Sequence, residues 1–207
     1  MNFYTNTVPS ATRAVLDDIK HIPDLQNFYL TGGTALSLYL GHRESEDLDF
    51  FIKTRFEPQI LQQKLLQYGN LENVQMEEGT LNVFMNRVKL QFLQYPYRLL
   101  EDVTPWNGIF LSSIVDIACT KLITISMRGS KKDFIDMYVL LQQITLKTIF
   151  AKLDEKYEGV NYNYPHILKS LVYFEDAEIQ PMPKMHIALT WEDVKKKMLH
   201  EAKQFTF

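Results

Sequence analysis

The sequence has little cysteine: Cys119 is the one thiol among 207 residues, so no disulfide can form within the chain. Cys119 lies in an apolar stretch with helical spacing, which favours a small buried side chain over a reactive one. A chain without internal disulfides suits a reducing compartment.

Long apolar runs are also absent. No stretch is long enough to span a bilayer, and the N-terminal MNFYTNTVPS lacks the basic and apolar segments of a signal peptide. Together with the single thiol, these absences predict a cytoplasmic protein with no membrane partner.

The chain has no strong charge of either sign. The formal net charge is -3, with nine basic and thirteen acidic residues up to Leu111, then thirteen basic and twelve acidic residues from Ser112 onward. Neither half is basic enough for bulk electrostatic binding of nucleic acid. Any such contact must therefore come from a local patch.

Repeats, low-complexity segments and zinc-ligand spacing among the five histidines are absent as well. What remains is a chain with 46% hydrophobic and 13% aromatic residues, which is ample for a packed core. The length allows one large domain or two small ones.

The spacing of apolar residues predicts an α+β fold: a mixed sheet of about five strands with flanking helices, then a helical C-terminal half. Strands are expected at 28–30, 48–52, 71–76, 81–85 and 88–95. Helices are expected at 11–22, 34–40, 57–67, 114–128, 132–143, 146–156, 166–173 and 191–204. A junction at 96–110 divides the chain into domains 1–110 and 111–207, and 175–185 is expected to be a surface loop.

The stretch from 28 to 52 contains the residues on which the functional interpretation depends. Gly32 and Gly33 separate an expected strand from an expected helix, and Asp47 and Asp49 stand at the start of the next strand. Because strand side chains alternate between faces, the two aspartates point the same way, roughly 7 Å apart.

This arrangement has a chemical use. Two neighbouring carboxylates repel each other unless a cation lies between them, and oxygen ligands suit Mg²⁺ or Mn²⁺. A glycine turn that opens a helix presents free backbone N–H groups to a phosphate. Each motif alone is weak evidence, but the two in this order predict a phosphate site facing a metal site.

The same residues resemble a known signature. Gly32-Gly33, thirteen residues and then Asp47-Leu48-Asp49-Phe50 resemble the polymerase-beta-type nucleotidyltransferase superfamily. The fuller string GGTALSLYLGHRESEDLDFF, with Lys121, Arg128 and KKDFIDMYVLL further on, resembles its AbiEii/AbiGii toxin branch. The resemblance covers about residues 28 to 142.

The resemblance implies an enzyme that moves a nucleotidyl group from a nucleoside triphosphate to an RNA or tRNA end or to a protein. It also implies a metal cofactor, Mg²⁺ or Mn²⁺, and a bacterial toxin with an antitoxin partner. By resemblance the catalytic residues are Asp47, Asp49, Lys121 and Asp133, with Asp47 and Asp49 as metal ligands. The nucleotide-binding residues are Gly32, Gly33, Thr34, Arg43, Ser45, Lys121 and Arg128.

The expected helix at 114–128 places Lys121 and Arg128 on the same face as its apolar stripe. Two cations on a buried side need an anion. Both side chains could instead reach solvent or pair with a structural carboxylate, and for Arg128 the two interpretations are balanced. For Lys121 we favour triphosphate, which predicts a site assembled across the two halves.

Four further residues have alternative interpretations. Ser130 and Asp133 fit a helix capping box as well as an active-site position, and a role for Asp136 in orienting Lys121 or Arg128 stays open. Arg43 fits either nucleotide binding or a surface pair with a neighbouring glutamate, Glu44 or Glu46.

One position departs from the superfamily pattern. A third carboxylate is expected on the strand at 88–95, and Gln91 stands there instead. An uncharged amide is a poor metal ligand and cannot act as a base. Either one metal is held firmly and a second arrives with the triphosphate, or the chain is a nucleotide-binding module without turnover. A third alternative is a hydrolase that uses Asp47 as its nucleophile, as haloacid dehalogenase phosphatases do. The sequence does not support it, because the small hydroxyl residue that those enzymes carry soon after Asp-x-Asp is missing here.

Overall fold

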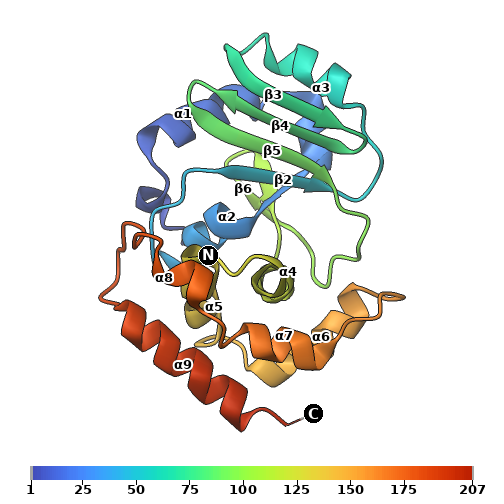
Figure 1. Ribbon diagram of the computed structural model, residues 1–207. Helices are drawn as coiled ribbons and strands as arrows, with labels where there is room; N and C mark the ends of the chain where they lie inside the picture. Colours follow the sequence, from blue (N-terminus) through green and yellow to red (C-terminus); the bar gives the residue numbers. More distant parts are fainter. Residues whose placement is uncertain (1, 207) are drawn as a thin grey trace.

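The computed structural model describes residues 2–206 and confirms the α+β fold (Figure 1). Within these residues the strands form one mixed sheet of seven, in the order β3-β4-β5-β2-β1-β7-β6, instead of about five. The strands are β1 (Tyr29–Thr31), β2 (Leu48–Ile52), β3 (Leu71–Glu77), β4 (Thr80–Met85), β5 (Val88–Gln94), β6 (Thr104–Trp106) and β7 (Ile109–Leu111).

The two extra strands lie in the segment that was expected to be a junction. β7 pairs in parallel with β1, and β6 pairs antiparallel with β7 across the turn at Asn107 and Gly108. Each is three residues long, which is too short for an alternating pattern to show in the sequence. The predicted boundary after residue 110 falls inside β7, and the division into two domains stays a prediction.

The helices follow the sequence expectation closely, and those at 146–156 and 191–204 match it to the residue. The helical elements are η1 (Thr5–Thr7), α1 (Ser10–Ile19), η2 (Pro23–Asn27), α2 (Gly32–Leu40), α3 (Pro58–Leu65), α4 (Ile114–Met127), α5 (Lys131–Leu140), α6 (Leu146–Lys156), α7 (Tyr164–Ser170), α8 (Glu175–Glu178) and α9 (Trp191–Gln204). The short α8 lies in the segment expected to be a loop. In the described residues, 2–206, we find no helix with the length and apolarity needed to cross a membrane.

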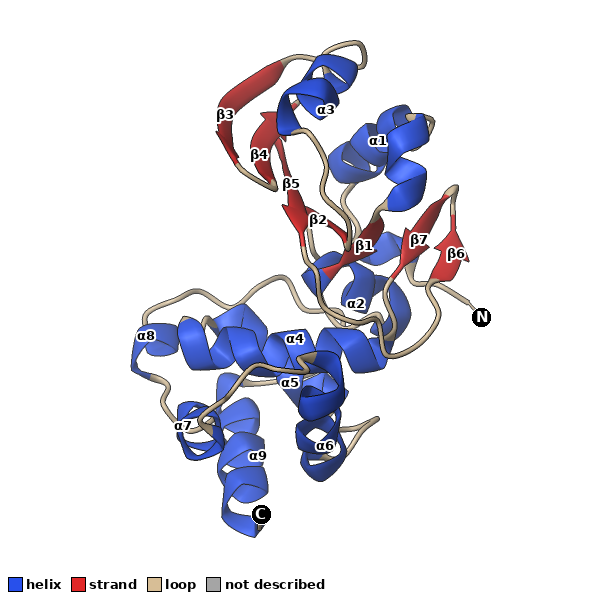
Figure 2. Cartoon of the chain, turned by 90° about the vertical axis from the view of Figure 1, so that its right-hand side faces the viewer, coloured by secondary structure: helices blue, strands red, loops and turns tan. Residues whose placement is uncertain are grey.

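The two faces of the sheet differ. α1 and α3 lie on one side of β3, β4 and β5 (Figure 2), and strand residues such as Val83 and Phe92 are fully buried. Residues that alternate with them, including Asp49, Asn82 and Gln91, are only half-buried. Because alternate strand residues point to opposite faces, these polar side chains share the face away from α1 and α3.

α2 connects the sheet to the helical half. It follows β1 directly and packs against α4 and α5. A buried ion pair between Asp116 of α4 and Lys156 of α6 (2.5 Å) holds the helical half together, and Asp116 also accepts a hydrogen bond from the Leu100 backbone N–H (3.1 Å). The segment between the sheet and α4 is therefore fixed to the helices.

Candidate active site

The Gly32-Gly33 turn brings side chains close to the backbone at the start of α2. Gly32 has a φ of +68°, which favours glycine, and a Cβ there would lie 2.6 Å from Asp49 Oδ2. A Cβ at Gly33 would lie 2.4 Å from Arg43 Nη2. Both glycines are thus required by the close approach of Asp49 and Arg43 to the helix N-terminus.

Thr34 and Ser45 hold the loop before β2 against α2. The Thr34 hydroxyl donates to Ser45 Oγ (2.9 Å) and lies within hydrogen-bonding distance of the Asp47 backbone carbonyl. Both side chains are buried. These two predicted nucleotide-binding residues therefore position the backbone that leads into Asp47.

Asp47 and Asp49 lie at the beginning of β2 and are both half-buried. Among the described residues, neither carboxylate forms a salt bridge. Burial raises the pKa of Asp49, the negative charge of Asp47 adds to the rise, and Lys121 opposes it. Two carboxylates without a basic partner fit a divalent cation, as the sequence predicts.

Gln91 lies beside this pair. It stands opposite Asp49 in the parallel pairing of β5 with β2, and Asp49 stands opposite Thr31 on β1. Paired residues point to the same face of a sheet, so the position expected to hold a third carboxylate adjoins Asp49 and holds an amide.

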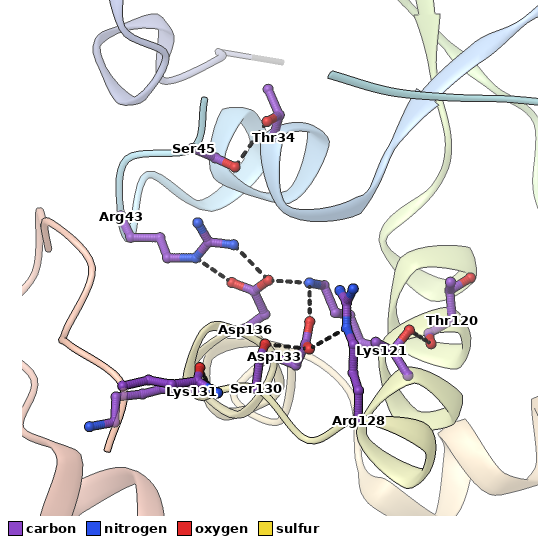
Figure 3. A network of polar contacts seen from close by, with 12 residues as sticks. Thr34, Arg43, Ser45, Thr120, Lys121, Arg128, Ser130, Lys131, Asp133 and Asp136 are labelled. Carbon is purple, nitrogen blue, oxygen red and sulfur yellow. Dashed lines mark hydrogen bonds and ion pairs between the residues drawn. The ribbon is translucent and has the colours of Figure 1, made fainter. Parts of the chain in front are cut away.

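Asp136 on α5 is the centre of a buried polar network (Figure 3). Arg43 donates from Nε to Oδ1 (2.7 Å) and from Nη2 to Oδ2 (2.9 Å). His42 Nε2 lies 2.8 Å from Oδ1, and Lys121 Nζ lies 2.6 Å from Oδ2. One carboxylate thus connects the loop before β2 to α4.

Asp136 and Lys121 stay ionised at neutral pH because their opposite charges outweigh the effect of burial. Burial alone would raise the pKa of Asp136, but Arg43 and Lys121 hold it well below its ordinary value. Burial alone would lower the pKa of Lys121, but Asp136 and Asp133 raise it above its ordinary value. Lys121 therefore keeps its positive charge although its side chain is only 9% exposed.

Asp133 is the second carboxylate of the network. It accepts from Lys121 Nζ (2.8 Å), Ser130 Oγ (2.6 Å) and Arg128 Nε (3.3 Å). Burial tends to raise its pKa, but Lys121 outweighs burial and the pKa is lowered. Ser130 stands at the N-cap of α5 as predicted, but the capping box is wrong because its hydroxyl donates to Asp133 and caps no backbone N–H.

Arg128 differs from the sequence expectation. α4 ends at Met127, so Arg128 leaves the helical path and its side chain is 68% exposed. The prediction of a second cation on the buried face is therefore wrong, although Arg128 still reaches Asp133. The interpretation of Arg43 as a surface pair with Glu44 or Glu46 is also wrong, because Arg43 is buried and pairs with Asp136.

Sequence reasoning missed His42. Its ring is buried, Nε2 faces Asp136, and Nδ1 has no hydrogen-bond partner among the described residues. Burial lowers its pKa more than Asp136 raises it, so the ring is neutral at pH 7. No local pattern identifies His42, since its partner lies 94 residues away.

Residues 184–186, which precede α9, pack against the loop at residues 42–44. Met185 pairs with Arg43 in an antiparallel bridge, Glu44 N donates to the Lys184 carbonyl (2.8 Å), and His186 N donates to the His42 carbonyl (2.9 Å). An ion pair between Lys184 and Glu44 (2.6 Å) adds to the contact. Three distant segments of the chain thus meet at Arg43.

The sequence matches a protein family and an individual relative. Residues 14–98 and 73–206 match the family described as "Nucleotidyl transferase AbiEii toxin, Type IV TA system". An uncharacterised protein of Aquifex aeolicus is 33% identical over 199 residues, which cover 93% of this chain and 95% of that protein.

Solved structures share the fold. A candidate nucleotidyltransferase from Helicobacter pylori superposes with a TM-score of 0.57 at 16% identity, over 97% of this chain and 93% of the other. The nucleotidyltransferase toxin MenT4 from Mycobacterium tuberculosis gives 0.57 at 15% identity, over 95% and 82%. At this identity the likeness shows the fold.

Proposed function

The chain belongs to the AbiEii family of nucleotidyl transferase toxins, and from this premise we propose that it transfers a nucleotidyl group from a nucleoside triphosphate to an acceptor hydroxyl. The acceptor is an RNA or tRNA end or a protein. The toxin family further favours an antitoxin protein as a partner in a bacterial cytoplasm.

The observation that carries the proposal is the pairing of two unneutralised carboxylates with a cationic network beside the start of α2. Buried Lys121 and Arg43 and exposed Arg128 contribute three positive charges, and buried Asp133 and Asp136 contribute two negative charges. The surplus positive charge lies beside the N-terminus of α2, which itself favours an anion. A triphosphate supplies that anion.

Asp47 and Asp49 would hold Mg²⁺ or Mn²⁺. When bound, such an ion polarises a phosphoryl oxygen and offsets the negative charge that develops during transfer. Within the described residues no cluster of three or more His, Cys, Asp or Glu side chains is placed to hold a metal. Two carboxylates with water and substrate phosphates as further ligands are typical of Mg²⁺.

In the proposed reaction the acceptor oxygen forms a bond to the α-phosphorus, and the bond from that phosphorus to the pyrophosphate bridging oxygen breaks. Pyrophosphate leaves with the electron pair, and the hydroxyl proton passes to water. Lys121 stabilises the charge on the leaving group as a point charge. Asp133 and Asp136 are positioning residues, since each holds the Lys121 ammonium.

The test is direct. The protein is incubated with Mg²⁺, each α-labelled nucleoside triphosphate in turn and total tRNA, and the macromolecules are separated from free nucleotide. Label on RNA or on protein supports the proposal and identifies the acceptor class. Tight triphosphate binding without any transferred label would overturn it.

That second outcome defines the alternative function, a nucleotide-binding module without turnover. Gln91 beside Asp49 favours it, because an amide adds no charge to the metal site and takes no proton. Retention of the buried Lys121 network favours the enzyme, since a module that only binds nucleotide has no need of a cation positioned on a leaving group.

A further inference from the structure

A cavity of about 550 Å³ lies at the other end of β2 from the two aspartates. It is bounded by η2, the end of β2, the segment at 53–57 and the start of α3. At roughly 3.3 Å per strand residue, Ile52 in its wall lies about 16 Å from Asp47. Ile52 stands three positions after Asp49 in the same strand, so the two side chains point to opposite faces of the sheet. The cavity is therefore separate from the candidate active site.

The floor of this cavity is apolar and held in place by packing. Phe28, Ile52 and Leu61 line it and are each at most 6% exposed. The Phe28 ring makes edge-on contacts with two other rings, at centroid distances of 5.2 Å from Phe56 and 5.5 Å from Phe92. Close-packed rings resist collapse, so the cavity is present before any ligand binds, as is usual for small-molecule sites.

Two apolar side chains extend the wall toward solvent. Phe56 is half-buried, and Ile60 on α3 is 52% exposed. The buried face of α3 is formed by Leu61 and Leu65, so Ile60 is not needed to dock the helix. A single exposed apolar side chain is common on any protein surface. Here it borders a cavity with an apolar floor, which favours a ligand with an apolar body.

The charged side chains of the wall are paired with one exception. Asp24 forms an ion pair with Lys64. Glu57 forms one with Arg55, at 3.5 Å. Lys53 is exposed and forms neither an ion pair nor a side-chain hydrogen bond within the part of the chain that the structure describes. One ammonium matches a singly charged carboxylate better than a phosphate ester, which carries about two negative charges at pH 7.

We propose that this cavity is a binding site for a small apolar carboxylate, an aryl or alkyl acid. The apolar body fills the space over Phe28 and Ile52, and the carboxylate accepts from the Lys53 ammonium. Asn27 and Thr54 also line the wall and offer an amide and a hydroxyl as further donors. The cavity volume of about 550 Å³ lies within the roughly 300–1,000 Å³ of small-molecule pockets. This site does not depend on the proposed nucleotidyl transfer.

The experiment uses the full chain with 4-phenylbutyrate as the probe and 4-phenylbutanamide as its uncharged counterpart. Ligand-detected NMR titrations measure the dissociation constants. Two variants change the wall: Lys53→Gln removes the charge, and Ile60→Glu replaces apolar surface with a carboxylate. The matched controls are Lys147→Gln, at an exposed site on α6, and Leu66→Glu, at a 53% exposed site where α3 ends. Neither control position lines the cavity.

The wild type should bind 4-phenylbutyrate with a dissociation constant of about 1 mM or lower, and the amide at least about fivefold more weakly. Each wall variant should bind the acid at least about fivefold more weakly, because a charge contact or part of the apolar wall is lost. The two control variants should bind it as the wild type does, since surface substitutions away from a site have small effects.

The same chemistry occurs at the C-terminus of a peptide that ends in an apolar residue. N-acetyl-Gly-Gly-Phe with a free carboxylate, compared with its C-terminal amide, separates the two sources. Tighter binding of the peptide acid than of 4-phenylbutyrate assigns the site to a chain end, and weaker binding assigns it to a free acid.

Equal affinity for 4-phenylbutyrate and its amide overturns the inference, because the carboxylate would then have no partner in the site. Absence of binding at about 10 mM acid has the same meaning, since a ligand of this size that fits the cavity binds below that concentration. Unchanged binding by either wall variant also overturns it. Every titration is made without nucleoside triphosphate, so a failure of the proposed nucleotidyl transfer does not alter the result.

Discussion

Arg43 and Asp136 form a two-pronged ion pair in the interior of the protein, with Nε 2.7 Å from Oδ1 and Nη2 2.9 Å from Oδ2. Arg43 belongs to the loop before β2, and Asp136 to α5. A bidentate pair fixes the angle of the guanidinium as well as its distance. The Gly32-Gly33 turn, which lies against this guanidinium, is thereby held in a defined position relative to the helical half.

Asp136→Asn should lower the free energy of unfolding by about 3–5 kcal/mol, because it leaves buried cations without their counter-charge. Urea unfolding at pH 7 measures the effect. Asp17→Asn is the control, since Asp17 pairs with Lys20 on the surface and its loss should cost less than about 1 kcal/mol. Equal decreases in the free energy of unfolding would show that the buried network stabilises the fold no more than a surface ion pair does.

Lys121→Ala should reduce kcat for nucleotidyl transfer about 10²-fold or more, because it removes a charge contact that strengthens in the transition state. The fold should survive, since Asp133 keeps Ser130 and Arg128, and Asp136 keeps Arg43. Single-turnover kinetics and circular dichroism give both readouts. Lys132→Ala, an exposed neighbour on α5, is the control. Undiminished transfer in the Lys121 variant contradicts the assigned role.

Asp49→Asn should abolish the Mg²⁺ dependence of triphosphate binding, because one of two charged ligands is lost. In the wild type, protons compete with metal for Asp49, so metal affinity should fall as the pH falls through its raised pKa, at a higher pH than for an ordinary aspartate. Titration calorimetry across pH measures both effects. Asp18→Asn on the exposed side of α1 should change neither. Metal-dependent affinity that survives in the Asp49 variant places the metal elsewhere.

Gly33→Ala should prevent triphosphate binding, because the new Cβ would displace the Arg43 guanidinium from the turn. Ser37→Ala is a control in the same helix: the Ser37 hydroxyl is buried without a hydrogen-bond partner in the described chain, so its removal should leave binding intact. Calorimetry at saturating Mg²⁺ decides between them. If both variants bind alike, the phosphates do not lie on this turn.

His42 should make the protein less stable as the pH falls below 6.5, the ordinary pKa of a histidine side chain. Burial lowers the pKa of His42 in the folded protein, so below pH 6.5 the unfolded chain binds a proton that the folded chain does not. The free energy of unfolding then declines by at most about 1.4 kcal/mol per pH unit. His42→Gln should remove this decline, measured as the difference from wild type between pH 7 and pH 5. Parallel curves would mean that His42 titrates normally.

The sequence predicts those parts of the site that depend on local spacing. Gly32, Gly33, Asp47 and Asp49 lie within eighteen residues, and strand and helix periodicity suffices to orient them. The contact of Asp136 with Lys121 agrees with the orienting role that the sequence left open. Its contacts with Arg43 and His42 could not be predicted, because they span more than 90 residues.

Two other differences have equally specific causes. Arg128 was placed on a helix face, but α4 stops one residue before it, and helix ends are poorly defined by periodicity. β7 is placed by its pairing with β1 and β6 by its pairing with β7, and no three-residue segment reveals such a pairing by itself.

The bridge between Arg43 and Met185 also sets an order of events during synthesis. A nascent chain that has emerged only as far as α5 already contains both aspartates, Lys121 and Asp136, yet the loop that carries Arg43 lacks its backbone partners at Lys184 and His186. The loop is completed only after residues 184–186 leave the ribosome. For a chain of a toxin family, this order delays completion of the candidate active site until late in translation, and a product terminated before residue 184 would lack the backbone partners of the Arg43 loop.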